Sequence, residues 1–161
     1  MNEEVSVLAG GCFWGLEYLL SELSGVMKTE VGYSGGELEN PKYEDVKTGR
    51  SGHVESVRAR FNVDILSYSE LLDYFFSIHD PTTYMRQMND IGSQYRSVIF
   101  YMDDRQRMDA LKAVDRAYKN WGKKIVTEIA PFKIFWLAEE YHQKYLIKNP
   151  GGYNCHYIRK F

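Results

Sequence analysis

Cysteine is scarce in this sequence, with two residues among 161. Two cysteines exclude the dense disulfide framework of a small secreted domain, and a chain of this length can bury a core without such bridges. The N-terminus MNEEVSVLAGG lacks the basic start and the apolar run of a secretory signal. We therefore expect a cytoplasmic protein with reduced thiols.

An excess of charge of one sign is also lacking. The 20 Lys and Arg residues nearly balance the 22 Asp and Glu residues, and the net charge is -2. This balance predicts no nucleic-acid partner and no anionic-membrane partner. No stretch approaches the roughly 18 apolar residues that a membrane-spanning helix needs.

Linkers and repeats are absent from the pattern as well, and only four prolines occur. We therefore expect a single domain over residues 1–161. Alternating or continuous apolar residues predict strands at residues 5–9, 29–33, 54–63, 98–102 and 125–129. Helical periods and end signals predict helices over residues 12–23, 67–79, 104–121 and 138–147.

Two polar segments interrupt this alternation. Residues 35–52 read as a long loop, and residues 148–161 as an irregular glycine-rich tail that carries Cys155. The pattern favours an α+β fold, a two-layer α/β sandwich with a mixed β-sheet, over a doubly wound parallel sheet.

Cys12 is the candidate nucleophile. It follows a strand and the pair Gly10-Gly11, and it begins a predicted helix. Unpaired backbone N–H groups at a helix start favour a thiolate and lower the pKa of a cysteine. From this local pattern alone, an inert buried cysteine at a tight turn is an equal alternative.

Glu55 is the candidate proton donor. Counting back by twos along the predicted strand places it on the same face as Phe61, Ala59 and Val57, together with His53. Burial raises the pKa of a carboxyl group, which suits an acid that must donate a proton near neutral pH. The alternative is a frayed strand end that exposes Glu55 to solvent.

Two aromatic residues, Phe13 and Trp14, directly follow Cys12. Aromatic rings beside a nucleophile can form an apolar cup for a methyl thioether group, because sulfur and methyl pack well on ring faces and edges. The same residues would suit a binding module that grips methionine-like side chains without chemistry, or simply a core.

Seven segments spread over nearly the whole chain match one known family. They are GGCFWGLE (10–17), VGYSGG (31–36), PKYEDV (41–46), GHVE (52–55), HDPTT (79–83), NDIGSQYRS (89–97) and EEYHQKYL (139–146). In these segments the chain resembles the A-type peptide methionine sulfoxide reductases. The resemblance implies a catalytic α+β sandwich with a ferredoxin-like plait core.

The resemblance also implies roles for individual residues. Cys12 matches the nucleophile, Glu55 the proton donor, and Phe13 with Trp14 the pocket for the methyl group. Tyr43 and Tyr95 match hydroxyls that bind the sulfoxide oxygen, and Asp90 a polar residue of the same pocket. The implied substrate is methionine S-sulfoxide, free or in oxidised proteins, and the implied product state of Cys12 is a sulfenic acid.

Cys155 matches the resolving cysteine of many relatives only approximately. Relatives place that cysteine directly after a Gly-Tyr pair, whereas Asn154 intervenes here. We expect a Cys12–Cys155 disulfide that thioredoxin or another thiol reductant reopens. If Cys155 is instead passive, an external thiol must reduce the sulfenic acid directly.

The remaining histidines and the glycines point to no cofactor. The four histidines and two distant cysteines lack metal-ligand spacing, and neither a phosphate loop nor a dinucleotide fingerprint is present. The competing enzyme class is an acyl-transfer hydrolase that uses Cys12 with His53 as base. We expect a monomer without a metal or a cofactor. Met85 and Met88 depart from the family pattern and are either packing or oxidisable residues.

Overall fold

A six-stranded mixed sheet organises this protein in a computed structural model that describes residues 2–161. The strands follow the order β7-β6-β1-β3-β2-β8; β6 and β7 pair in parallel, and the other neighbours are antiparallel. They are β1 (Glu3–Ala9), β2 (Val26–Ser34), β3 (Val54–Asn62), β6 (Val98–Tyr101), β7 (Glu128–Pro131) and β8 (Trp136–Leu137). The short strands β4 (Arg86–Gln87) and β5 (Asp90–Ile91) form a separate hairpin. The mixed α+β architecture predicted from the sequence is confirmed.

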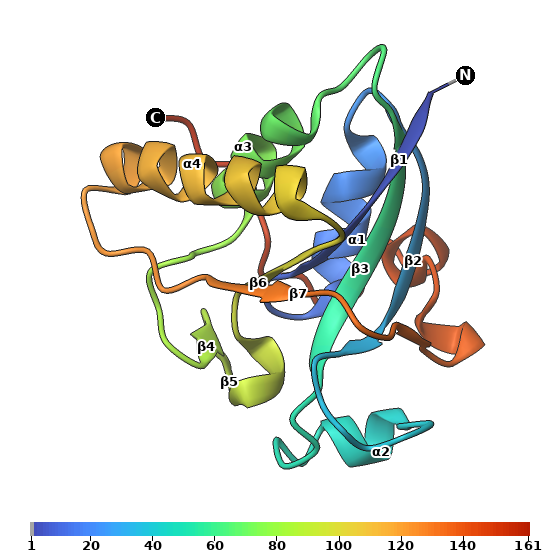
Figure 1. The fold of residues 1–161 in the computed structure, drawn as a ribbon. Coiled ribbons are helices and arrows are strands. Elements are labelled where there is room, and N and C mark those ends of the chain that lie inside the picture. Colours follow the sequence, from blue (N-terminus) through green and yellow to red (C-terminus); the bar gives the residue numbers. More distant parts are fainter. Residues whose placement is uncertain (1) are drawn as a thin grey trace.

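Helices cover one face of this sheet (Figure 1). They are α1 (Phe13–Glu22), α3 (Tyr68–Ile78) and α4 (Asp104–Trp121), whereas α2 (Tyr43–Val46) lies beyond the start of β3. The short helix α5 (Tyr145–Lys148) and single 3₁₀ turns at Ser93–Tyr95 and Glu140–His142 complete the helical elements. Leu16 of α1, Leu72 of α3 and Ala113 of α4 pack with Val57 and Ile99 of the sheet in one buried cluster. This apolar layer holds the start of α1 at the end of β1.

The opposite face of the sheet is covered by chain rather than by helices. Val54 and Phe100 form a second buried cluster there, and Phe132 and Phe135 of the connection from β7 to β8 pack against it. Strand β3 is therefore buried on both faces near its start, although its sequence alternates like a half-exposed strand. Among residues 2–161, no helix combines the length and hydropathy needed to cross a membrane.

Several predicted boundaries hold because local chemistry sets them. Ser67 and Glu70 form the expected capping box, with both reciprocal hydrogen bonds at 3.0 Å. Gly122 ends α4 in the left-handed conformation with φ 66°.

The helix predicted over residues 138–147 is wrong. A 3₁₀ turn and the short helix α5 replace it, and Lys144 interrupts the chain between them with φ 54°. The adjacent Gln143 instead bonds the backbone of β2, because its side chain accepts from the N–H of Val31 and donates to its carbonyl oxygen, both at 2.9 Å. Two smaller differences occur: the strand predicted at 125–129 begins at Glu128, and the predicted loop 35–52 contains α2.

Candidate active site

Cys12 lies at the junction between β1 and α1, where it is the N-cap residue of the helix. Gly11 makes this turn with φ 90°, and a Cβ atom there would lie 2.5 Å from the side chain of Gln87. Gln87 is itself fixed by hydrogen bonds to both backbone polar groups of Asp80. The side chain of Cys12 is partly accessible and forms no disulfide.

Glu55 is buried on β3 directly behind the helix start. It is 2% exposed, and one carboxyl oxygen accepts a hydrogen bond of 3.1 Å from the backbone N–H of Phe13. Burial raises its pKa to about 8, and the negative charge of Asp90 acts in the same direction. The predicted burial of Glu55 is confirmed, and the carboxyl group is mostly protonated at neutral pH.

The expectation of a lowered pKa for Cys12 is wrong for the resting protein. Burial raises the pKa of the thiol, and the charges of Glu55, Asp90 and Cys155 raise it further. The hydrogen bond from the backbone of Trp14 lowers it, but by less. The helix start is a weaker anion site than its position suggests, because the N–H of Phe13 already bonds Glu55.

Aromatic side chains form a wall beside Cys12. Phe13 is 1% exposed, and its ring centroid lies 5.7 Å from that of Tyr33, so it supports the wall from within. Trp14 stacks on Tyr145 with centroids 3.7 Å apart, and its indole N–H donates to Nδ1 of His142 at 2.9 Å. Helix α5, which carries Tyr145, lies against α1.

His142 joins this wall to the rest of the site. Its ring lies 5.1 Å from Phe13 and 4.8 Å from Tyr43, centroid to centroid. Because Nδ1 accepts from Trp14, the neutral ring carries its proton on Nε2. The sequence analysis assigned no site role to His142 or Tyr145. Their place in the family segment EEYHQKYL (139–146) is the feature that could have identified them.

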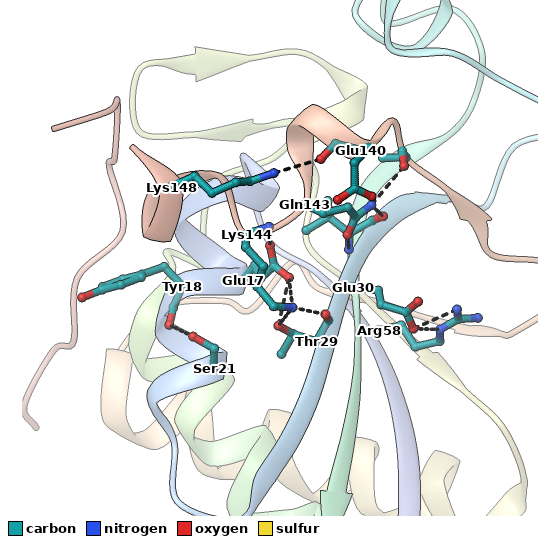
Figure 2. Close-up of polar contacts among 12 residues, drawn as sticks. Glu17, Tyr18, Ser21, Thr29, Glu30, Arg58, Glu140, Gln143, Lys144 and Lys148 are labelled. Carbon is teal, nitrogen blue, oxygen red and sulfur yellow. Dashed lines mark hydrogen bonds and ion pairs between the residues drawn. The ribbon is translucent and has the colours of Figure 1, made fainter. Parts of the chain in front are cut away.

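The segment that carries His142 and Tyr145 is fastened by a buried carboxylate (Figure 2). Glu17 of α1 is 1% exposed and accepts hydrogen bonds from the backbone N–H of Lys144 at 2.8 Å, from its ammonium group at 3.1 Å and from the hydroxyl of Thr29 at 2.9 Å. The ammonium group also donates to the carbonyl oxygen of Thr29. Glu17 thus ties the aromatic wall to the helix that begins at Cys12.

Two tyrosine hydroxyls belong to the same charged neighbourhood. Tyr43 begins α2, and its backbone N–H donates to Glu139 at 2.9 Å, while Tyr95 ends the 3₁₀ turn. Burial raises the pKa of both hydroxyls, and the charges of Glu55 and Cys12 contribute. Both groups therefore stay protonated and can donate hydrogen bonds at neutral pH.

Asp90 connects the site to the C-terminal tail. Its carboxylate accepts a hydrogen bond of 3.2 Å from the hydroxyl of Tyr153 and a bond of 3.6 Å from the thiol of Cys155. The charge of Asp90 also raises the pKa of Cys12. The structure thus brings Cys155 to a carboxylate that neighbours Cys12, and both cysteines are free thiols.

His53 does not support the hydrolase alternative. Its Nδ1 accepts from the N–H of Gly36 at 3.1 Å, and its Nε2 lies 2.7 Å from the carbonyl oxygen of Leu38. Both ring nitrogens are engaged by the loop backbone, so neither is free to take a proton from Cys12. His53 holds the loop that leads to Tyr43.

Two methionines lie near Gln87 in the chain. Met85 and Met88 have φ values of 51° and 53°, and Met88 is 39% exposed. A hollow of about 390 Å³ lies on the other face of the sheet beside Phe100 and Trp136 and does not include Cys12. Within residues 2–161, no three His, Cys, Asp or Glu side chains are grouped as metal ligands.

Comparisons with known proteins agree with this geometry. The family model described as "Peptide methionine sulfoxide reductase" matches residues 4–161. The "Peptide methionine sulfoxide reductase MsrA" of Clostridium botulinum (strain Okra / Type B1) is 51% identical over 150 residues, which cover 93% of this chain and 95% of that protein.

Two solved structures of a yeast protein are also similar. The crystal structure of Mxr1 from Saccharomyces cerevisiae in reduced form has a TM-score of 0.94 and 39% identity, and the match covers 98% of this chain and 93% of that one. Mxr1 in complex with Trx2 has a TM-score of 0.69 and 29% identity, with 98% and 91% covered.

Proposed function

Because this chain belongs to the peptide methionine sulfoxide reductase family, we propose that it reduces methionine S-sulfoxide to methionine with Cys12 as the nucleophile. The substrate is the free amino acid or an oxidised residue of a protein. The observation that carries the mechanism is the pairing of Cys12 with a buried carboxyl group, Glu55, whose pKa of about 8 keeps it protonated.

The aromatic wall receives the substrate. The methyl group and sulfur pack on Trp14, which Tyr145 and His142 hold in place. Phe13 supports the wall from the core side. The sulfoxide oxygen then faces the hydroxyls of Tyr43 and Tyr95 and the carboxyl group of Glu55, three donors at neutral pH.

The chemical step transfers one oxygen atom. Glu55 protonates the sulfoxide oxygen while the sulfur of Cys12 attacks the substrate sulfur and gives up its own proton. The S–O bond of the substrate breaks and the oxygen ends on the sulfur of Cys12. The transient S–S bond then breaks as its electron pair returns to the substrate sulfur, which leaves as the thioether of methionine, and Cys12 becomes a sulfenic acid. One sulfoxide and one thiol thus give one thioether and one sulfenic acid, and Glu55 ends the step protonated again.

The raised pKa of the Cys12 thiol fits this order of events. The carboxylate charge of Glu55 contributes to that rise, so a protonated Glu55 makes ionisation of Cys12 easier. A bound substrate places a polarised, electron-poor sulfur next to the thiol, and its oxygen accepts hydrogen bonds from the site. Cys12 therefore stays a neutral thiol at rest and becomes nucleophilic when the sulfoxide is bound.

Cys155 resets the enzyme. Its thiol condenses with the sulfenic acid of Cys12, which forms a disulfide and releases water. The position of Cys155 on Asp90 supports this role. The reductant is thioredoxin or another thiol reductant, a role that the complex of the similar yeast protein with Trx2 supports. We further propose that residues 1–161 act as one catalytic unit in the cytoplasm.

A single-turnover experiment tests this function. Reduced protein receives one equivalent of methionine S-sulfoxide without a reductant, and released methionine and intact mass are measured. We expect one methionine per chain from the wild type, none from Cys12→Ser, and release slowed by about 100-fold or more in Glu55→Gln.

The final mass identifies the second thiol. Wild-type protein should lose two hydrogen atoms, whereas Cys155→Ser should release methionine and remain a sulfenic acid that dimedone traps. Wild-type protein that releases no methionine would contradict the proposed function. Methionine release without loss of two hydrogens would contradict only the assignment of Cys155.

A further inference from the structure

The tail that carries Cys155 is fastened by the next residue, His156. Its Nε2 lies 2.6 Å from the carbonyl oxygen of Gly10, and the side chain is 5% exposed. A carbonyl oxygen only accepts hydrogen bonds, so Nε2 must carry the proton. Burial also lowers the pKa of His156 to about 4, so the ring is neutral and its Nδ1 carries a free electron pair.

The tail also packs closely against α1 at Gly15. Asn154 turns the chain by accepting the backbone N–H of His156 at 2.9 Å. A Cβ atom on Gly15 would lie 2.4 Å from Oδ1 of Asn154 and 2.5 Å from Nδ1 of His156. The glycine at this buried helical position is therefore explained by the close approach of the tail.

These contacts all reach the segment that positions the nucleophile. Gly10 directly precedes the turn to Cys12, and Gly15 lies in the first turn of the helix that Cys12 caps. The thiol of Cys155 lies 3.9 Å from Nδ1 of His156 and 3.6 Å from a carboxylate oxygen of Asp90. Both neighbours are acceptors, so they can orient the single thiol proton away from the attacking electron pair.

We propose that His156 is the positioning residue of the disulfide step: it anchors the tail to Gly10 and holds the thiol of Cys155 for attack on oxidised Cys12. Asn154 takes part in this positioning, because its turn brings His156 onto Gly15. The inference rests on the proposed function, in which Cys155 is the second thiol.

The step balances without a further reagent. The thiol of Cys155 and the sulfenic acid of Cys12 form one S–S bond, and the S–O bond of the sulfenic acid breaks. The thiol proton, oriented by Nδ1 of His156 and by Asp90, ends on the departing hydroxyl group as water. Cys155 is oxidised and the sulfenic sulfur of Cys12 is reduced.

Rapid-mixing measurements with methionine S-sulfoxide separate the two steps. Methionine release reports the first step, and loss of the dimedone-reactive species reports disulfide formation. We expect His156→Ala to slow disulfide formation by on the order of 10- to 100-fold, because a misplaced reacting group costs about that much, with methionine release little changed. The exposed neighbour Tyr157→Ala is the matched control and should change neither rate.

The variant His156→Gln separates the effect of the hydrogen bond to Gly10 from a general loss of stability. Its amide N–H can still reach toward the carbonyl oxygen of Gly10, so it should recover part of the lost rate, which a general loss of stability would not allow. The inference is overturned if His156→Ala forms the disulfide at the wild-type rate, or if it slows methionine release equally. Failure of wild-type protein to release methionine would instead overturn the proposed function.

Discussion

The backbone N–H of Phe13 donates a hydrogen bond of 3.1 Å to the carboxyl group of Glu55. The residue after the nucleophile is thus tied directly to the proposed proton donor, and β3 fixes the start of α1. The bond also uses an N–H group that would otherwise stabilise a thiolate at the helix start. This single contact links the raised pKa of Cys12 to the placement of the acid.

Protonation of Glu55 should make stability depend on pH. Its pKa rises from 4.5 to about 8 on folding, so between these values the folded protein keeps a proton that the unfolded chain has lost. The free energy of unfolding therefore falls as pH rises through this window, by up to a few kcal/mol. The measurement is urea unfolding of reduced wild-type protein and Glu55→Gln at pH 5 and pH 8, where the variant should lack this loss.

The comparison with Glu55→Gln isolates this one group. Burial lowers the pKa of His79 to about 3 and of His156 to about 4, which makes stability rise with pH below about 6.5 in both proteins. That opposite trend cancels in the difference. Equal pH dependence of the two proteins would show that Glu55 is ionised in the fold at neutral pH.

Trp14→Ala should weaken substrate binding more than chemistry. The indole stacks on Tyr145 and donates to His142, so its face is held beside Cys12. Loss of the sulfur–aromatic contact should raise KM for methionine S-sulfoxide by up to about tenfold, with kcat little changed. Trp121→Ala is the control, because that indole bonds the carbonyl oxygen of Phe76 on α3 and should leave KM unchanged. A fall in kcat alone would contradict a binding role for Trp14.

Glu17→Ala should destabilise the protein and loosen the aromatic wall. The carboxylate accepts three hydrogen bonds, and its removal leaves donors of Thr29 and Lys144 without this partner, which costs about 1–3 kcal/mol. KM should rise as well, because the segment with His142 and Tyr145 loses its fastening. Figure 2 also shows the control, the pair of Glu30 and Arg58, where Glu30→Ala should cost less than about 1 kcal/mol and leave KM unchanged. Equal effects of the two variants would contradict a special role for Glu17.

The sequence was informative where a local period or cap decides the structure. The strand count back from Phe61 placed Glu55 on a buried face, and the Ser67–Glu70 spacing placed the start of α3. The alternation along β3 is typical of a strand with one exposed face, yet Val54 on the second face is buried too. Its cover, Phe132 and Phe135, comes from a segment with no period that sequence alone could assign to the sheet.

Long-range polar contacts account for what the sequence could not predict. The break at Lys144 follows from bonds to Glu17 and from those of Gln143 to Val31, all more than a hundred residues distant in sequence. The raised pKa of Cys12 follows from burial, which a helix-start motif does not reveal. The placement of His142 against Trp14 has the same origin.

Gly15→Ala tests the packing of the tail on α1 from the helix side. Alanine should favour the helix itself by about 0.5–1 kcal/mol, but its methyl group would collide with Asn154 and His156. We expect slower formation of the Cys12–Cys155 disulfide, unchanged methionine release, and faster alkylation of Cys155 as the tail lifts away. Ser21→Ala on the same helix, whose hydroxyl bonds the nearby carbonyl oxygen of Tyr18, should alter none of these rates. The substitution leaves His156 itself intact, so slow formation of the disulfide would show that the position of the tail sets this rate. Disulfide formation at the wild-type rate would instead show that Cys155 reaches Cys12 without the packing of the tail on α1.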